Sequence, residues 1–223
     1  KKTVNKALSL FYLLLRISVI GILIAQFFNG NFENVMLCVL TLILFAIPPL
    51  IERRLKIEIP DTLEVIILLF IYAAEILGEI RSYYTAFPAW DTMLHTINGF
   101  LCAAIGFSLI DILNRNAKIK FTLSPVYVAL AAFCFSMTIG VLWEFFEFGM
   151  DRLFHMDMQK DTIVHTISSV MLDHTNSNIP ITIDGITSVA VNGQDLGFSG
   201  YLDIGLYDTM EDLFVNFIGA LTF

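Results

Sequence analysis

The sequence has little charge and little cysteine, and each shortage excludes a class of protein. Charged residues make up 15% of the 223 residues, whereas hydrophobic residues make up 57% and the mean hydropathy is +0.74. Soluble domains carry about a quarter charged residues, so an ordinary water-soluble globule is excluded. The three cysteines, Cys38, Cys102 and Cys134, are scattered through apolar runs, which argues against a disulfide framework or a thiolate metal motif.

Long apolar runs are what the sequence has in abundance. They cover residues 7–28, 34–51, 62–80, 92–113 and 125–149, and a sixth begins at Asp208. At about 1.5 Å per residue these runs predict an all-α membrane protein with a bundle of about six transmembrane helices. The sixth run is still apolar at Phe223, so we expect the natural protein to continue. No small-residue cleavage pattern follows the first run, which favours a retained span over a signal peptide.

We expect one integrated domain in three parts. Residues 1–150 hold five transmembrane helices, residues 151–206 form an extracytoplasmic cap, and residues 207–223 begin the sixth helix. In the cap, Asp157, Asp161 and His165 are each four residues apart, which predicts a short amphipathic helix at the membrane interface. The alternation from 181 to 191, with the turn dipeptides at 184–185 and 192–193, predicts a small β-hairpin.

One motif occurs three times. The segments at 90–99 (WDTMLHTING), 160–169 (KDTIVHTISS) and 207–216 (YDTMEDLFVN) share an aspartate and a polar residue four positions later. On a helix that spacing puts both side chains on one face. The pairs are Asp91 with His95, Asp161 with His165, and Asp208 with Asp212.

Other acidic residues occur at the ends of neighbouring spans. Glu144 and Glu147 follow the apolar part of the fifth span, and Glu75 and Glu79 lie near the end of the third. The third and fifth spans would reach the outer face at their C-terminal ends, where the fourth and sixth begin, so these groups should converge in one layer. Arg16, in the middle of the first span, is a costly charge that favours a buried carboxylate partner or a water-filled cavity.

A simpler interpretation is helix capping. Aspartate before threonine is an ordinary helix start, and it occurs at Asp61, Asp91, Asp161 and Asp208; with Glu64, the first of these has the form of a capping box. Capping does not explain His95 and Asp212 in the following turn, nor the two glutamates of the fifth span.

These residues resemble a known family. The pattern Trp-Asp-x-x-x-His at 90–95, Glu-x-x-Glu at 144–147 and Asp-x-x-x-Asp at 208–212, with Asn216 and Gly219, resembles the YjdF-type family of uncharacterised bacterial inner-membrane proteins and, more distantly, VanZ-like proteins. The resemblance implies a multipass protein of the bacterial plasma membrane and brings no established reaction with it.

Two functional classes are compatible with the pattern. The first is a site for a divalent metal ion (Zn²⁺, Mn²⁺, Mg²⁺ or Ca²⁺) that acts on or binds a lipid headgroup or envelope molecule, as in a metal-dependent hydrolase or transferase. The second is a proton- or cation-coupled transporter, and a structural scaffold is a third possibility. The candidate ligands are Asp91, His95, Glu144, Glu147, Asp208 and Asp212, of which Glu144, Glu147 and His95 are the catalytic candidates; Glu75, Glu79, Asp161 and His165 are supporting residues.

The acidic balance also bears on partners. The net charge is −8, and most of the 21 acidic residues fall on the predicted outer side, which favours cations there and argues against nucleic acid. The predicted partner is the lipid bilayer, and the oligomeric state is left open.

The basic residues predict the orientation, with the N-terminus in the cytoplasm and the site facing outward. Nine of the 13 basic residues fall on one side by the positive-inside rule: Lys1, Lys2, Lys6, Arg53, Arg54, Lys56, Arg115, Lys118 and Lys120. Reporter fusions after Lys120 should therefore be active in the cytoplasm, and fusions near Asn178 should be active outside it. The opposite pattern would place the polar layer at the cytoplasmic face.

Overall fold

The computed structural model describes residues 6–55, 59–114, 123–175 and 177–223. The chain forms two compact units, Lys1–Leu94 and His95–Phe223, and each is described by itself. Six of the basic residues behind the predicted orientation lie outside the described residues: Lys1, Lys2, Lys56, Arg115, Lys118 and Lys120.

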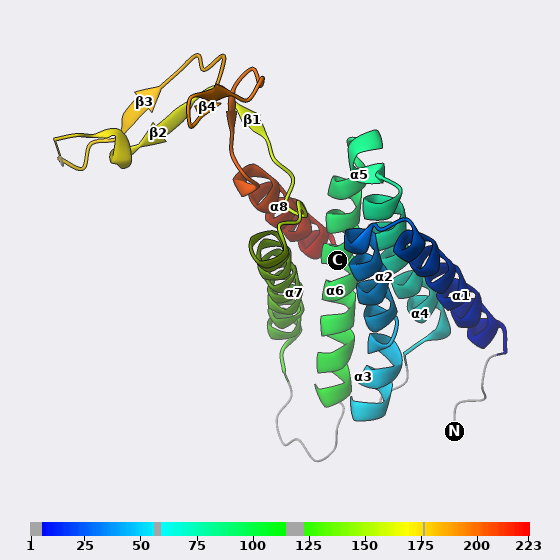
Figure 1. Ribbon diagram of the computed structural model, residues 1–223. Helices are drawn as coiled ribbons and strands as arrows, with labels where there is room; N and C mark the ends of the chain where they lie inside the picture. Colours follow the sequence, from blue (N-terminus) through cyan, green and yellow to red (C-terminus); the bar gives the residue numbers. More distant parts are fainter. Residues whose placement is uncertain (1–5, 56–58, 115–122, 176) are drawn as a thin grey trace. The chain divides into compact units, whose positions relative to one another are not determined.

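The first unit is helical, with elements coloured blue to cyan-green in Figure 1. They are α1 (Lys6–Phe28), α2 (Phe32–Leu44), α3 (Ile47–Leu55), α4 (Asp61–Tyr72), the π-helix η1 (Ala73–Ile80) and α5 (Tyr83–Ala86). Pro48 and Pro49 have no backbone N–H to donate, and a turn at 45–46 separates α2 from α3 just before them. The core of this unit consists of almost fully buried side chains: Val19, Cys38, Phe45, Leu68 and Ile76.

The predicted capping box at the start of α4 is wrong. The N-cap residue is Pro60 and makes no side-chain cap hydrogen bond. Glu64 is buried instead, and its Oε1 accepts a hydrogen bond of 2.7 Å from the Tyr12 hydroxyl of α1. This carboxylate therefore makes a tertiary contact with α1.

The second unit contains long helices. Helix α6 (Trp90–Asn114) begins in the first unit and continues into the second, where α7 (Pro125–Phe154) and α8 (Leu206–Thr222) follow. Ser124 caps α7 by accepting a hydrogen bond from the Tyr127 N–H, and Gly205 precedes α8 with a φ of 89° that favours glycine. Helix α7 runs five residues beyond the predicted span, which ends at Gly149, and the left-handed conformation of His155 ends it.

The predicted fold class, an all-α membrane protein with a small capping segment, is confirmed. Within the described residues, four helical stretches are long and apolar enough to cross a membrane: Lys6–Phe28, Phe32–Arg54, Trp90–Asp111 and Pro125–Phe154. The other two predicted spans correspond to α4 with η1, which are 12 and 8 residues long, and to α8, which is 17 residues long.

Short antiparallel strand pairs lie between α7 and α8. Strand β1 (Ile163–Val164) pairs with β6 (Tyr201–Leu202), β2 (Ile167–Ser169) with β3 (Ile181–Ile183), and β4 (Ala190–Val191) with β5 (Gln194–Asp195). A single 3₁₀ turn, η2 (Val170–Leu172), follows β2. Asn192 and Gly193 both have positive φ and form the predicted turn, but it joins β4 to β5, and β3 pairs with β2 rather than with a strand near 191.

The amphipathic helix predicted through Asp157, Asp161 and His165 is not formed. Residues 155–162 are irregular, and strands begin at Ile163. The β-branched residues of this segment favour extended backbone, and nearby carboxylates accept its backbone N–H groups.

Glycines let the helices of the second unit approach closely. A Cβ on Gly99 of α6 would overlap the backbone oxygen of Asn216, and a Cβ on Gly219 of α8 would overlap the backbone oxygen of Thr96. On α7, a Cβ at Gly140 would come within 2.9 Å of the Asn216 side chain. Helices α6 and α8 are therefore in backbone contact, as small residues permit between membrane helices.

Replacing Gly219 by alanine tests this contact. The added methyl group meets backbone rather than a flexible side chain, so we expect a loss of about 1–3 kcal/mol of stability, seen as a lower midpoint of thermal unfolding in detergent. The matched control is Gly149→Ala on α7, where nothing lies within 4 Å and alanine, as the better helix former, should be neutral or stabilising by up to about 1 kcal/mol. Equal effects of the two changes would show that the close approach does not matter.

Candidate functional site

Two glutamates lie on one face of α7. Glu144 and Glu147 are three residues apart, so they project to the same side of the helix, and both are buried, with 4% and 8% of their surface exposed. The indole N–H of Trp143 donates a hydrogen bond of 2.9 Å to Oε1 of Glu147. This contact within α7 fixes where the Glu147 carboxylate points.

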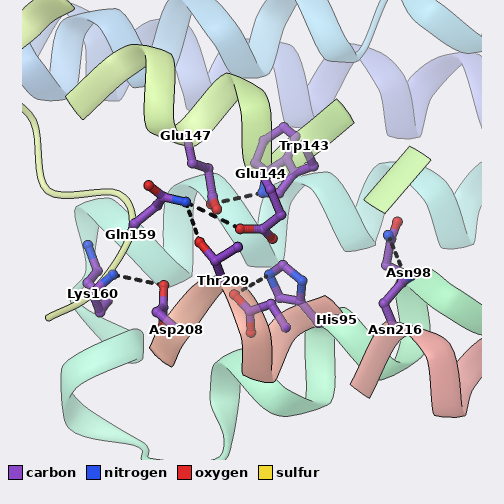
Figure 2. A network of polar contacts seen from close by, with 11 residues as sticks. His95, Asn98, Trp143, Glu144, Glu147, Gln159, Lys160, Asp208, Thr209 and Asn216 are labelled. Carbon is purple, nitrogen blue, oxygen red and sulfur yellow. Dashed lines mark hydrogen bonds and ion pairs between the residues drawn. The ribbon is translucent and has the colours of Figure 1, made fainter. Parts of the chain in front are cut away.

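An aspartate of α8 and a histidine of α6 join these glutamates. Asp212 is 3% exposed, and carboxylate oxygens of Glu144, Glu147 and Asp212 all lie within 4.8 Å of one another. Nε2 of His95 lies 3.5 Å from Oδ2 of Asp212. We call these four residues the carboxylate–histidine cluster; Figure 2 shows it from close by.

A glutamine from the capping segment contacts the same cluster. The side-chain amide of the buried Gln159 donates to Oε2 of Glu144 at 3.5 Å and to the Thr209 hydroxyl at 2.5 Å (Figure 2). A Cβ on Gly205 would come within 2.7 Å of the Gln159 Cβ, so the absence of a side chain there leaves space for Gln159 beside the start of α8. Gln159 thus connects α7 with α8 at the cluster.

Three further carboxylates hold this loop in place. Asp151 accepts hydrogen bonds of 2.7 and 3.0 Å from the backbone N–H groups of Met158 and Gln159. Asp208 accepts one of 2.8 Å from the Lys160 N–H. Asp203 accepts one of 2.7 Å from the Thr162 N–H and another of 2.7 Å from the N–H of Tyr207, at the start of α8.

An amide layer lies next to the cluster along the same helices. The Asn98 amide of α6 donates to Oδ1 of Asn216 of α8 at 3.1 Å, and the Asn216 amide in turn contacts the sulfur of Met137 of α7 at 3.5 Å. The Ser136 hydroxyl donates to the Gly99 carbonyl at 2.7 Å. Because Asn216 follows Asp212 by one turn, this layer fixes the register in which α8 presents its aspartate.

The structure brings together the central residues of the predicted site. His95, Glu144, Glu147 and Asp212 form the cluster, and Asp91, one turn before His95 on α6, has a carboxylate oxygen within 4.8 Å of that histidine. Asp208 anchors the loop. Gln159 and Thr209 were not predicted, since neither belongs to a helical pattern of ionisable groups. The hydrogen bond from Trp143 to Glu147 was not predicted either, although the i, i+4 spacing of the two residues could have revealed it.

For the remaining supporting residues, a role in the site stays a prediction. His165 lies in the strand region, where its Nδ1 donates to the Ile186 carbonyl at 2.9 Å, because a carbonyl can only accept. Asp161 is exposed in the same segment, and Glu75 and Glu79 belong to the first unit.

The cluster concentrates negative charge away from water. Two charges at the spacing of these carboxylates repel by about 3 kcal/mol at an effective dielectric constant of about 20. A protonated His95 offsets one of the three negative charges. A bound cation, or protons on the carboxylates, would offset the rest.

The helices and the cluster define a class: a multipass membrane protein with a buried carboxylate–histidine layer. The chain belongs to the family described as "Predicted membrane protein (DUF2238)", whose model matches residues 10–223. The expected membership in a family of uncharacterised membrane proteins is thereby confirmed, while the more distant likeness to VanZ-like proteins stays a prediction.

One curated relative adds a second comparison. A Thermotoga maritima protein printed as "Uncharacterized protein" is 26% identical over 106 residues, which are 48% of this chain and 53% of that protein. The chain therefore spans about half the length of this relative. No solved structure gives a significant match.

The raised pKa of Asp161 allows the charges of the loop beside the cluster to be tested through the pH dependence of stability. Partial removal from water and the charges of Asp157, Asp203 and Asp151 raise the pKa of Asp161, and Lys160 opposes them. Because the folded state holds this proton more tightly than the unfolded state, stability falls as pH rises from the ordinary aspartate pKa, about 3.9, through the raised one. Asp161→Asn should therefore raise the unfolding midpoint slightly at pH 7, and the gain should vanish below about pH 3.5.

Asp173 provides a control of opposite sign. Hydrogen bonds from the hydroxyl and backbone N–H groups of Thr175 and Ser177 lower its pKa. Its contribution to folding stability is therefore present above the ordinary aspartate pKa and is lost as the pH falls. Asp173→Asn should therefore lower the unfolding midpoint at pH 7. A destabilised Asp161→Asn protein at pH 7 would contradict the charge argument.

Proposed function

We propose that this membrane protein binds a divalent metal ion at the carboxylate–histidine cluster. The observation that carries the proposal is the convergence of three buried carboxylates, from α7 and α8, within 4.8 Å of one another, with His95 beside Asp212. Three oxygen donors and one imidazole form a donor set suited to Zn²⁺ or Mn²⁺, and carboxylates alone also suit Mg²⁺ or Ca²⁺.

Charge and surroundings support the same assignment. Three carboxylates with one imidazolium carry a net charge of −2, which a divalent cation neutralises, and a neutral imidazole would itself be a ligand. Gln159 and Trp143 hydrogen-bond the carboxylates from outside the donor set, as partners of metal ligands commonly do.

The proposed role of the metal is chemistry at the outer membrane surface. A divalent ion activates bound water and stabilises charge on a phosphate or carbonyl, which suits hydrolysis or transfer at a lipid headgroup or an envelope molecule. In that role Glu144 or Glu147 would accept a proton and His95 would orient or donate one. The location we propose is the bacterial plasma membrane, with the N-terminus in the cytoplasm and the cluster facing outward.

A proton- or cation-coupled transporter is the second candidate. The observation that favours it is the burial of Glu144 and Glu147 within α7, a helix that is long and apolar enough to cross a membrane. In this case the carboxylates would carry protons, so Glu144→Gln would be tolerated or even stabilising, because it mimics the protonated side chain.

Metal binding can be measured on the chelator-treated protein in detergent, with Zn²⁺ and Mn²⁺ added separately. At a metal concentration about 100 times Kd, binding should stabilise the fold by about 2.7 kcal/mol and raise the unfolding midpoint. Asp212→Asn and Glu144→Gln should each weaken calorimetric binding by at least about tenfold, by analogy with losses seen at metal sites.

The matched control is Glu211→Gln, the exposed neighbour of Asp212 on α8, which should bind as the unmodified protein does. Absence of binding by either ion, together with a stable Glu144→Gln protein, would favour the transporter. Unchanged stability, metal content and transport in both cluster variants would leave a structural scaffold.

A further inference from the structure

A second buried carboxyl lies in the first unit, far along the chain from the proposed metal ligands. Glu75 belongs to η1, is 2% exposed, and is among the largest fully buried side chains of the described residues. Its Oε2 has no hydrogen-bond partner within the part of the chain that the structure describes. Its sequence neighbour Ile76 belongs to the apolar core formed with Val19 and Cys38.

The backbone at Glu75 is unusual as well. Residues 73–80 form a π-helix, a wide turn that is rare in proteins and frequent at functional sites. At Gly78 in the same segment, a Cβ would overlap the ring of Tyr84. The wide turn is therefore packed tightly and keeps an acidic side chain in an apolar core.

The surroundings disfavour an ionised Glu75. An isolated buried carboxylate costs several kcal/mol or more, and Glu79, one turn later, adds a repelling charge. Val19 of α1 lies in the same apolar core as Ile76, and α1 contributes the titratable groups Lys6, Tyr12 and Arg16. The other elements packed most extensively against η1 are α2, α4 and α5. Their described titratable groups are Glu33, Cys38, Asp61, Glu64, Tyr72, Tyr83 and Tyr84.

Arg16 and Tyr12 of α1 lie beside each other, and Tyr12 contacts the other buried glutamate of this unit, Glu64. The guanidinium of Arg16 on α1 lies over the ring of Tyr12, 5.3 Å from its centroid, and the Tyr12 hydroxyl donates to Glu64. Arg81, which directly follows η1, is exposed. Oε1 of Glu64 thus has a hydrogen-bond donor, whereas Oε2 of Glu75 has none among the described residues.

We propose that Glu75 is a proton-binding site within the membrane helices, a neutral carboxylic acid at neutral pH that exchanges its proton through the wide turn. This site is independent of the metal proposed at the carboxylate–histidine cluster. Glu64, equally buried but hydrogen-bonded to Tyr12, is the natural comparison.

Dicyclohexylcarbodiimide, an apolar reagent for protonated carboxyls, tests the proposal on the full chain in detergent. The acid adds across a C=N bond: the carboxyl oxygen bonds to the central carbon, the proton moves to nitrogen, and the acyl group then shifts to nitrogen to give a stable N-acylurea. Peptide mass spectrometry should find the adduct on Glu75. Its rate should fall about tenfold for each pH unit above the pKa of the group.

Two variants and one spectrum complete the test. Glu75→Gln should lose this adduct and the infrared C=O band of a buried carboxylic acid, which reports protonation even where the reagent cannot reach. Glu64→Gln should keep both. Absence of the band from the unmodified protein at neutral pH, or protection of Glu75 by Na⁺ at constant pH, would overturn the proposal.

The outcome is separable from that of the metal site. Glu75→Gln should bind Zn²⁺ or Mn²⁺ as the unmodified protein does, and Asp212→Asn should still be modified at Glu75. Either proposal can therefore fail while the other holds.

Discussion

The close approach of α6 and α8 is the constraint on which the second unit depends. Gly99 and Gly219 bring the two backbones into contact, and this distance allows the short side chains of Asp212 and Asn216 to reach His95 and Asn98. A wider separation would leave the carboxylate of Asp212 without its histidine. Dispersion contacts and hydrogen bonds, rather than a hydrophobic effect between helices, stabilise such packing in a bilayer.

Buried acidic side chains have different surroundings in the two units. In the second unit the acids are grouped, and Gln159, Trp143 and His95 contact them, which suits a shared counter-ion. In the first unit Glu64 relies on Tyr12, while Glu75 retains a buried oxygen without a partner among the described residues. The buried carboxyls are therefore grouped together, hydrogen-bonded to a tyrosine or, within the described chain, partly without a partner, and such differences in surroundings change the proton affinity of a carboxyl.

Periodicity in the sequence predicted the parts of the site that lie on helices. The shared motif correctly aligned Asp91 with His95 and Asp208 with Asp212, and the spacing of Glu144 and Glu147 placed both on one face of α7. The same spacing failed at Asp161 and His165, because that segment lacks a long apolar run and its β-branched residues are in strands. Gln159 could not be predicted, since its position depends on backbone bonds to Asp151 and on the space above Gly205, which are tertiary features.

The order of the chain has a consequence for biosynthesis. In the sequence, α7 and the strand region lie between His95 on α6 and Asp212 on α8. The ribosome therefore synthesises α6 and α7 before α8. Until α8 docks, Glu144 and Glu147 are two like charges on one helix with neither Asp212 nor Thr209 nearby. The cluster can therefore be completed only after α8 has been synthesised, by a contact between residues far apart in sequence.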